Sequence, residues 1–170
     1  MRTCRGFVLA LSLLAALSAC GVTAPRGNEG YADLDALPGP DADTTIDISL
    51  GPTLLGLAAR LVDDDPATRA LLQSLRGVRI KVYEIEEDSQ GVASELDRMG
   101  AELEQEGWER VIQVREQQGK TTQMLVKISG DKVAGLTVLA TDSVAVTLVN
   151  VLGPLQPEMF GRAIAALDAP

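Results

Sequence analysis

The sequence contains no histidine among its 170 residues. This excludes the Ser-His-Asp and Cys-His catalytic arrangements and every histidine-ligated metal site. Cysteine is almost as scarce, since only Cys4 and Cys20 occur, and aromatic residues make up 3% of the chain. Basic residues are outnumbered by acidic ones, 15 to 24, which gives a formal net charge of −9. Such a surface repels phosphate backbones, so nucleic acid is not expected as a partner.

The amino-terminal residues follow the order of a bacterial export signal. Arg2 and Arg5 form a short positive segment, and the apolar run over 6–16 that follows has eleven residues. A helix needs about 20 residues to cross a bilayer, so this run suits a signal peptide better than a membrane span. Leu17-Ser18-Ala19-Cys20 then resembles the bacterial lipobox, in which an aliphatic residue and two small residues precede a cysteine.

The lipobox resemblance implies cleavage between Ala19 and Cys20 and acylation of the Cys20 thiol. Residues 1–19 are therefore expected to be a lipoprotein signal peptide, and the lipid on Cys20 to hold the mature chain on a membrane. The alternatives are an ordinary secretory signal with a chance cysteine, or a buried core thiol. Because Gly21 and not aspartate follows the cysteine, the resemblance favours the outer membrane of the bacterial envelope, with the chain facing the periplasm.

The segment after Cys20 has the composition of a linker. Seven of the 23 residues over 21–43 are Gly or Pro, and five are acidic against one Arg. Such a segment buries too little apolar surface to offset the entropy of ordering it. We therefore expect residues 20–43 to be a lipidated cysteine and a flexible acidic tether, followed by a globular domain over 44–170. An alternative is that Tyr31, Leu34 and Leu37 form a short docking motif.

Alternation of apolar and polar residues predicts two separate strands, over 45–50 and 78–85, the second with Val78, Ile80 and Val82 on one face. Four further strands are predicted in series, joined by turns short enough for antiparallel neighbours. The last two of the series are almost wholly apolar, so we expect them to be central and covered on both faces. The four predicted ranges are 108–116, 121–128, 133–140 and 144–152.

Helical spacing predicts about four helices. The first begins at Pro52, the second begins at Pro66 with Asp65 as its N-cap, and the third ends at Gly107. The fourth is expected to begin near Pro157. Together the elements predict a single α+β domain, with helices packed on a mainly antiparallel sheet. The apolar faces are predicted to be Leu54, Leu57, Ala58 and Leu61; Leu71, Leu72 and Leu75; Val92, Leu96, Met99 and Leu103; and Phe160, Ala163, Ile164 and Leu167.

Three short motifs are similar to the DUF4252 family, which comprises uncharacterised bacterial envelope proteins, many of them lipoproteins. They are Ile48-Ser49-Leu50-Gly51, the stretch GVRIKVY over 77–83 and the stretch GWERV over 107–111. The resemblance covers residues 44–167. It implies no activity and supplies no catalytic residues.

No motif predicts a catalytic, cofactor-binding or metal site. The acidic clusters at 63–65 and 86–88 carry oxygen ligands for Ca²⁺ or Mg²⁺, but they lack the spacing of a calcium loop, and a helix cap and a solvated turn are favoured instead. Residues 129–132 are typical of a hairpin turn, and 119–122 lack the upstream glycine of a phosphate loop. Trp108 is expected to pack in the core or at an interface, in preference to forming a ligand platform.

We therefore expect an anchored, non-enzymatic protein that binds another envelope protein or regulates the envelope. A binder of a small apolar ligand or lipid is the first alternative, and it requires an apolar cavity of a few hundred Å³, on the order of known ligand sites, between helices and sheet. An acid- or metal-dependent hydrolase is the second, and it requires converging carboxylates with perturbed pKa values. No cofactor is predicted.

Overall fold

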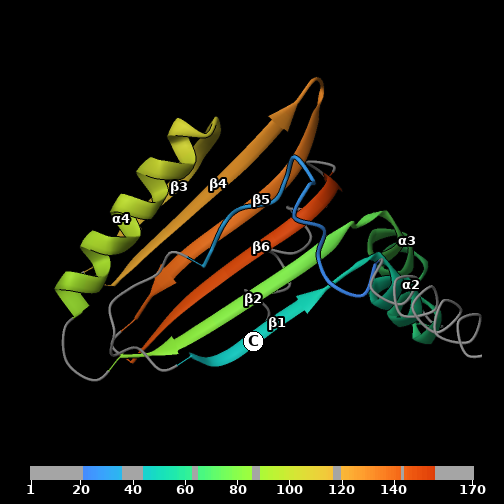
Figure 1. The fold of residues 1–170 in the computed structure, drawn as a ribbon, viewed down its shortest axis with the longest axis horizontal. Coiled ribbons are helices and arrows are strands. Elements are labelled where there is room, and N and C mark those ends of the chain that lie inside the picture. The colour runs from blue at the N-terminus through green and yellow to red at the C-terminus, as the bar shows by residue number, and fades with distance from the viewer. Residues whose placement is uncertain are drawn as a thin grey trace, which may run out of the picture.

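The computed structural model describes residues 21–35, 44–62, 65–85, 89–116, 120–142 and 144–155. Within these ranges six strands form one antiparallel sheet in the order β1-β2-β6-β5-β4-β3 (Figure 1). The elements in chain order are β1 (Thr44–Leu50), α2 (Pro52–Leu61), α3 (Pro66–Ser74), β2 (Gly77–Glu84), α4 (Ser89–Gln105), β3 (Trp108–Arg115), β4 (Thr121–Ser129), β5 (Lys132–Thr141) and β6 (Ala145–Leu155).

The predicted α+β class and antiparallel sheet are confirmed. β3 to β6 form the expected meander, and β6 and β5 are the two central strands. β6 also pairs with β2, so the earlier strands extend the meander at the β6 edge. The described residues contain three helices where about four were expected, and the predicted helix near Pro157 lies outside them.

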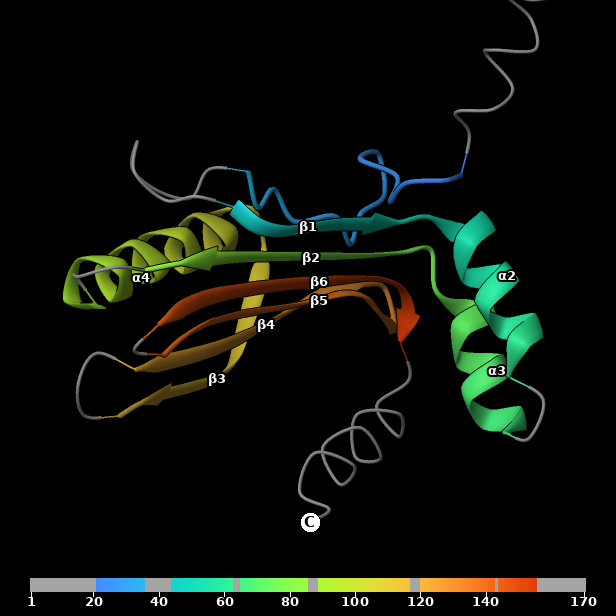
Figure 2. The same ribbon diagram turned by 90° about the horizontal axis from the view of Figure 1, so that it is seen from below.

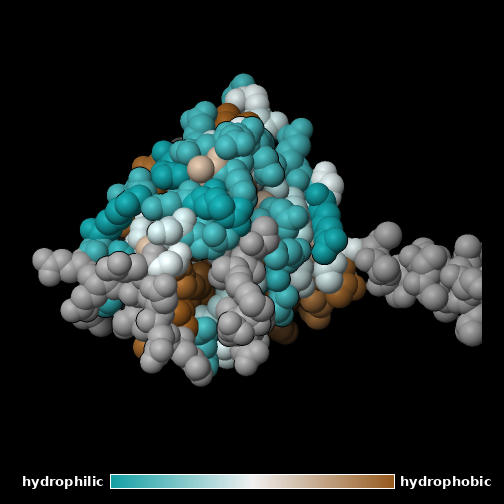
Figure 3. Space-filling model, turned by 60° about the vertical axis from the view of Figure 1, so that its left-hand side comes forward, coloured by the Kyte–Doolittle hydropathy of each residue, from teal (hydrophilic) through white to brown (hydrophobic). Residues whose placement is uncertain are grey.

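One face of the sheet, here called the covered face, lies under α4 and the amino-terminal residues. The blue amino-terminal segment crosses the strands on this side (Figure 1). Leu96, Met99 and Leu103 of α4 are buried there, as the helical spacing predicted. The other members of this core come from the strands and the segment: Ala32, Leu34, Tyr83, Trp108, Leu125, Leu139, Val146 and Leu148. The outward side of α4 is charged, and hydrophilic surface predominates over that side of the molecule (Figure 3).

The opposite face, here called the open face, is covered only at one end by described residues. A second core of Leu55, Leu75 and Leu155 lies there, between the α2–α3 pair and the strands. The pair follows the end of β1 and precedes β2, and it lies at the opposite end of the sheet from α4 (Figure 2). The middle of this face is half-exposed. Within the described residues, the expectation that both faces of β5 and β6 are covered holds on the covered face and at one end of the open face; residues 156–170, with the predicted fourth helix, lie outside them.

The buried side of α2 differs from the predicted one. Leu55 and Ala59 are buried, while the predicted core residues Leu57 and Leu61 are 54% and 78% exposed. Both sets have helical spacing, because the helix PTLLGLAARL is apolar nearly all round. The spacing alone therefore did not decide which side faces the sheet.

For residues 21–35, the structure corrects the prediction of a flexible tether. This segment lies on the covered face, and its own residues Ala24, Ala32 and Leu34 are buried against the sheet. The composition argument failed because it counted apolar side chains alone, whereas the segment is held largely through its backbone. Residues 36–43 lie outside the described residues, and the boundary of the globular domain at 44 stays a prediction.

Candidate functional site

A ladder of polar side chains holds the amino-terminal segment on the covered face. Ser49, Arg79, Asn150 and Thr137 are aligned across β1, β2, β6 and β5 by the strand register. Asn150 lies at the centre, where Oδ1 accepts from the Ala32 N–H at 3.1 Å and Nδ2 donates to the Gly30 carbonyl at 3.0 Å. Nδ2 is also within 3.1 Å of the Thr137 hydroxyl. Buried backbone groups need such partners, so the ladder and the segment complete each other.

The ladder continues from Asn150 across β2 and β1. On β2, Arg79 donates to the Ala32 carbonyl at 2.9 Å. On β1, the Ser49 hydroxyl accepts from the Ala24 N–H at 3.1 Å. Residues from three strands therefore bind the backbone of one segment, and the segment crosses the strands instead of pairing with an edge.

Glycine allows the segment to approach the sheet closely. A Cβ placed on Gly30 would lie 2.0 Å from the Ala134 carbonyl oxygen, and one on Gly135 would lie 2.5 Å from the Gly30 carbonyl oxygen. Both neighbours are backbone atoms, which cannot rotate away as a side chain can. The two glycines therefore fix the height of the segment above β5.

A cluster of charged residues lies beside the ladder. The Asp35 carboxylate forms ion pairs with Arg79 at 3.0 Å and with Lys81 at 2.7 Å. Lys81 also forms an ion pair with Asp47 at 3.3 Å. The side chains of Arg79 and Lys81 are 6% and 10% exposed, so both cations are nearly buried. The Arg79 guanidinium also lies 4.6 Å from the centre of the Tyr31 ring, a cation–π contact.

These contacts hold both partners in their charged forms. The hydrogen bond from Lys81 lowers the pKa of the Asp35 carboxyl, with Arg79 adding to the effect against the opposing influence of burial. Burial on its own would lower the pKa of Lys81, but its hydrogen bonds with Asp35 and Asp47 outweigh burial and raise it. A carboxylate held ionised between two cations is suited to binding the segment in place, and poorly suited to proton transfer near neutral pH.

A hollow of about 780 Å³ opens between this cluster and the start of the segment. Its wall combines the charged side chains of Arg26, Asp35, Asp47 and Arg79 with apolar surface from Ala24, Pro25 and Pro52. The hollow therefore differs from the apolar cavity that a carrier of a small apolar ligand requires. Among the described residues, no group of three or more acidic, histidine or cysteine residues is arranged to hold a metal ion.

The open face presents an unbroken apolar row. Neighbouring residues in the register cross all six strands, and every one of them is aliphatic or methionine. Five strand spacings separate the ends of the row, a width of about 24 Å. The end residues on the two edge strands, Ile48 and Ile112, are 40% and 39% exposed. The row consists of Ile48, Ile80, Val149, Val138, Met124 and Ile112.

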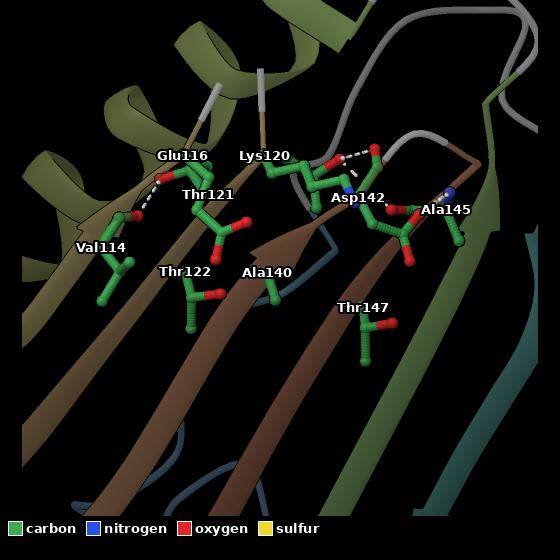
Figure 4. Close-up of a pocket in the computed structure, with 10 residues that line it drawn as sticks. Val114, Glu116, Lys120, Thr121, Thr122, Ala140, Asp142, Ala145 and Thr147 are labelled. Carbon is green, nitrogen blue, oxygen red and sulfur yellow. Dashed lines mark hydrogen bonds between the residues drawn. The ribbon is translucent and has the colours of Figure 1, made fainter. Parts of the chain in front are cut away.

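The next row on the open face is less apolar and includes a small hollow. Thr122, Ala140 and Thr147 lie side by side on β4, β5 and β6, and they line a depression of about 270 Å³ (Figure 4). Glu116, Lys120 and Asp142 lie at its rim, at the ends of the strands. Backbone N–H groups of Val144 and Ala145 donate to Asp142 and lower the pKa of its carboxyl. Asp142 therefore stabilises a turn and does not serve as one half of an acid–base pair in the hollow.

A second polar cluster joins α4 to β3 and β4. Asp97 accepts from Gln123 and from Arg115, each at 2.7 Å. Gln123 is fully buried, and its Oε1, like Nε of Arg110, has no hydrogen-bond partner among the described residues. The contacts of this cluster position α4 on the sheet.

The residues predicted as sites are only partly described. Leu17, Ser18, Ala19 and Cys20 lie outside the described residues, as do 63–64 and 86–88. Asp65 is the predicted N-cap of α3 and accepts from the Ala67 and Thr68 N–H groups. Trp108 is 3% exposed in the core, as expected, and Tyr83 is buried in the same core.

The sequence analysis predicted neither the polar ladder nor the open face. Arg79, Thr137 and Asn150 occupy alternate positions in otherwise apolar strands. Such a pattern indicates a face covered by something that supplies hydrogen-bond partners. The apolar positions between them mark the other face, and their regular spacing was the signal for a second, separate surface.

No helix in the described part of the chain is long and apolar enough to span a membrane. Comparison with curated proteins gives no match. The model of a family described as a domain of unknown function, DUF4252, matches residues 40–162, a range that contains every strand and helix described above. The chain therefore belongs to the DUF4252 family.

Proposed function

We propose that this chain is a lipid-anchored protein of the bacterial cell envelope that binds another envelope protein through the open face of its sheet. The single observation that carries the binding role is the apolar row from Ile48 to Ile112. A monomeric soluble protein seldom exposes a contiguous apolar surface of this kind unless something binds to it.

The shape of the open face favours a protein partner over a small ligand. Small-molecule sites are concave and enclose most of the ligand, whereas protein interfaces are broad and nearly flat. The row is about 24 Å wide by strand spacing, and the hollow beside it measures about 270 Å³. A partner with an uncharged apolar surface fits the row, because no charged residue interrupts it.

The charged cluster supports a role other than catalysis. Its carboxylates, Asp35 and Asp47, are each bound to a nearly buried cation. A hydrolase needs one carboxyl group that exchanges a proton near neutral pH, but the pKa of Asp35 is moved the other way.

The anchoring role rests on the lipobox at Leu17-Ser18-Ala19-Cys20. Mass spectrometry of the mature amino terminus tests it directly. We expect a chain that begins at an acylated Cys20 and fractionates with the outer membrane. A mature chain with an unmodified Cys20 would contradict the proposal.

Site-specific photo-crosslinking in intact cells tests the binding role. A photoreactive residue is placed at Ile48 or Ile112 on the open face, and at Glu102 on the outer side of α4 as the control. We expect one adduct of defined mass from both open-face positions and none from position 102, and we expect a Cys20→Ala background to lose it. Equal labelling at all three positions would contradict the proposal.

Two other crosslinking results would also contradict an envelope partner. An adduct of twice the chain mass would mean that a second copy occupies the face. A crosslink mapped by proteolysis to residues 156–170 of the same chain would mean that the carboxyl terminus occupies it.

A further inference from the structure

We propose that the outer side of α2 lies against the phospholipid bilayer, with Leu57, Leu61 and Val22 at the level of the lipid interface. The proposal rests on the lipid anchor at Cys20, and it adds a defined contact surface to that anchor. It concerns a different surface from the open face.

The position of Gly21 links the anchor to α2. The Thr53 N–H donates to the Gly21 carbonyl at 3.0 Å, and the Gly51 N–H donates to the Val22 carbonyl at 2.6 Å. Gly21 also lies against the Thr53 side chain. Gly21 follows Cys20 in the sequence, so the described chain starts at the amino-terminal end of α2 with the residue next to the anchor. The anchor is therefore attached at a fixed point on the domain.

A row of exposed residues runs along α2 from that point. Thr53, Leu57 and Leu61 are four residues apart and so follow one side of the helix. Leu57 is 54% exposed and Leu61 is 78% exposed, while the opposite side buries Leu55 and Ala59. Two leucines so exposed on the side that carries the anchor have an apolar surface that no described residue covers.

The charge of α2 favours a bilayer as the partner. The chain as a whole carries −9, yet α2 contains no acidic residue and its charged residue is Arg60, which is exposed beside Leu57. In the segment that follows the anchor, the Arg26 side chain is 81% exposed. At a lipid interface, arginine side chains pair with the phosphate groups while neighbouring apolar side chains contact the acyl chains. The acidic residues that follow α2 begin at position 63, after the row of leucines has ended.

The contact sets the orientation of the domain. β1 leads into α2, and β2 begins after α3, so this end of the sheet lies at the membrane and the strands lead away from it (Figures 1 and 2). The open face then lies roughly perpendicular to the membrane surface and stays accessible to a partner.

Depth-dependent fluorescence tests the contact in the lipidated full mature chain. Leu57→Cys, Leu61→Cys and the control Glu102→Cys are each labelled with an environment-sensitive fluorophore, since acylation leaves no other thiol in the mature chain. The proteins are reconstituted into vesicles of phosphatidylethanolamine and phosphatidylglycerol, with and without a quencher attached to the lipid. The substituted positions are exposed, so the domain is expected to fold normally.

We expect quenching by the lipid-attached quencher to be several-fold stronger at 57 and 61 than at 102. Equal quenching at the three positions, in protein that mass spectrometry shows to be acylated, would overturn the α2 contact and leave the anchor intact. Shielding of position 61 that is the same with and without vesicles would also overturn it, because a protein contact would then cover the leucine. A chain that lacks the acyl group and does not float with vesicles would instead contradict the proposed anchor.

Discussion

Ala32 and Asn150 lie 118 positions apart in the sequence and are joined by a buried hydrogen bond of 3.1 Å from the Ala32 N–H to Asn150 Oδ1. The same amide side chain donates to the Gly30 carbonyl at 3.0 Å. Both Ala32 and Asn150 are fully buried, so water does not replace these bonds when they are lost. One side chain therefore ties the beginning of the described chain to its last strand.

Replacing Asn150 by leucine should release the amino-terminal segment. The substitution removes the partners of two buried backbone groups, which we expect to lower the free energy of unfolding by about 1–3 kcal/mol. Denaturant unfolding and hydrogen exchange at the Ala32 amide measure the effect. Thr147→Val, on the open face of the same strand, is the matched control and should change stability by less than about 0.5 kcal/mol. An Asn150→Leu protein with a fully protected Ala32 amide would contradict the role of the ladder.

Replacing Gly30 by alanine should have a similar effect through steric overlap. The new Cβ would lie 2.0 Å from the Ala134 carbonyl oxygen, and we expect a loss of about 1–3 kcal/mol together with faster proteolysis within residues 21–35. Gly27→Ala is the control in the same segment, because a Cβ there meets no atom within 4 Å. If the two variants proved equally stable and equally resistant to protease, the close approach would be wrong.

Docking of the segment should weaken in acid. The pKa of Asp35 is lowered, first by the hydrogen bond from Lys81, so the stabilisation is present above the ordinary carboxyl pKa of about 4 and is lost as the pH falls through the lower value of the folded chain. We expect Asp35→Asn to be less stable than the native chain at pH 7 and equally stable near pH 2. Denaturation midpoints of the two proteins across this range measure the difference. Because Asp142 is present in both proteins, its own titration cancels. A difference that does not vary with pH would exclude the ion pairs as its source.

The two sides of α2 should respond differently to truncation. Leu55 is 3% exposed in the second core, and Leu55→Ala is expected to lower the free energy of unfolding by about 2–5 kcal/mol. Leu57→Ala should change the stability of the domain in solution by less than about 0.5 kcal/mol. Thermal or denaturant unfolding of both variants compares them. Equal losses would mean that the helix buries a different side.

The strands were predictable because their signals are local. The alternation over 45–50 and 78–85 and the turns between the last four strands placed six strands near their observed bounds. The apolar character of β5 and β6 placed them at the centre of the sheet. Asp65 and Pro66 marked the start of α3 for the same reason. Each of these signals depends on residues a few positions apart.

The candidate surfaces were less predictable because they depend on distant parts of the chain. The docking of residues 21–35 depends on Asn150, which a composition count of the segment does not include. The side of α2 that is buried depends on Leu155 and Leu75, which pack against it from other elements. Which face of β5 and β6 stays open likewise depends on where α4 and the segment lie.

The contact between Ala32 and Asn150 also implies an order in which the parts of the domain fold. β2 pairs with β6, so β1 and β2 have no place in the sheet until the last strand has been added. Residues 21–35 bind across that completed sheet, and their contacts therefore form late. On the export route proposed above, the segment would still be undocked when the chain emerges, so Cys20 would be accessible to processing enzymes before the rest of the domain is assembled.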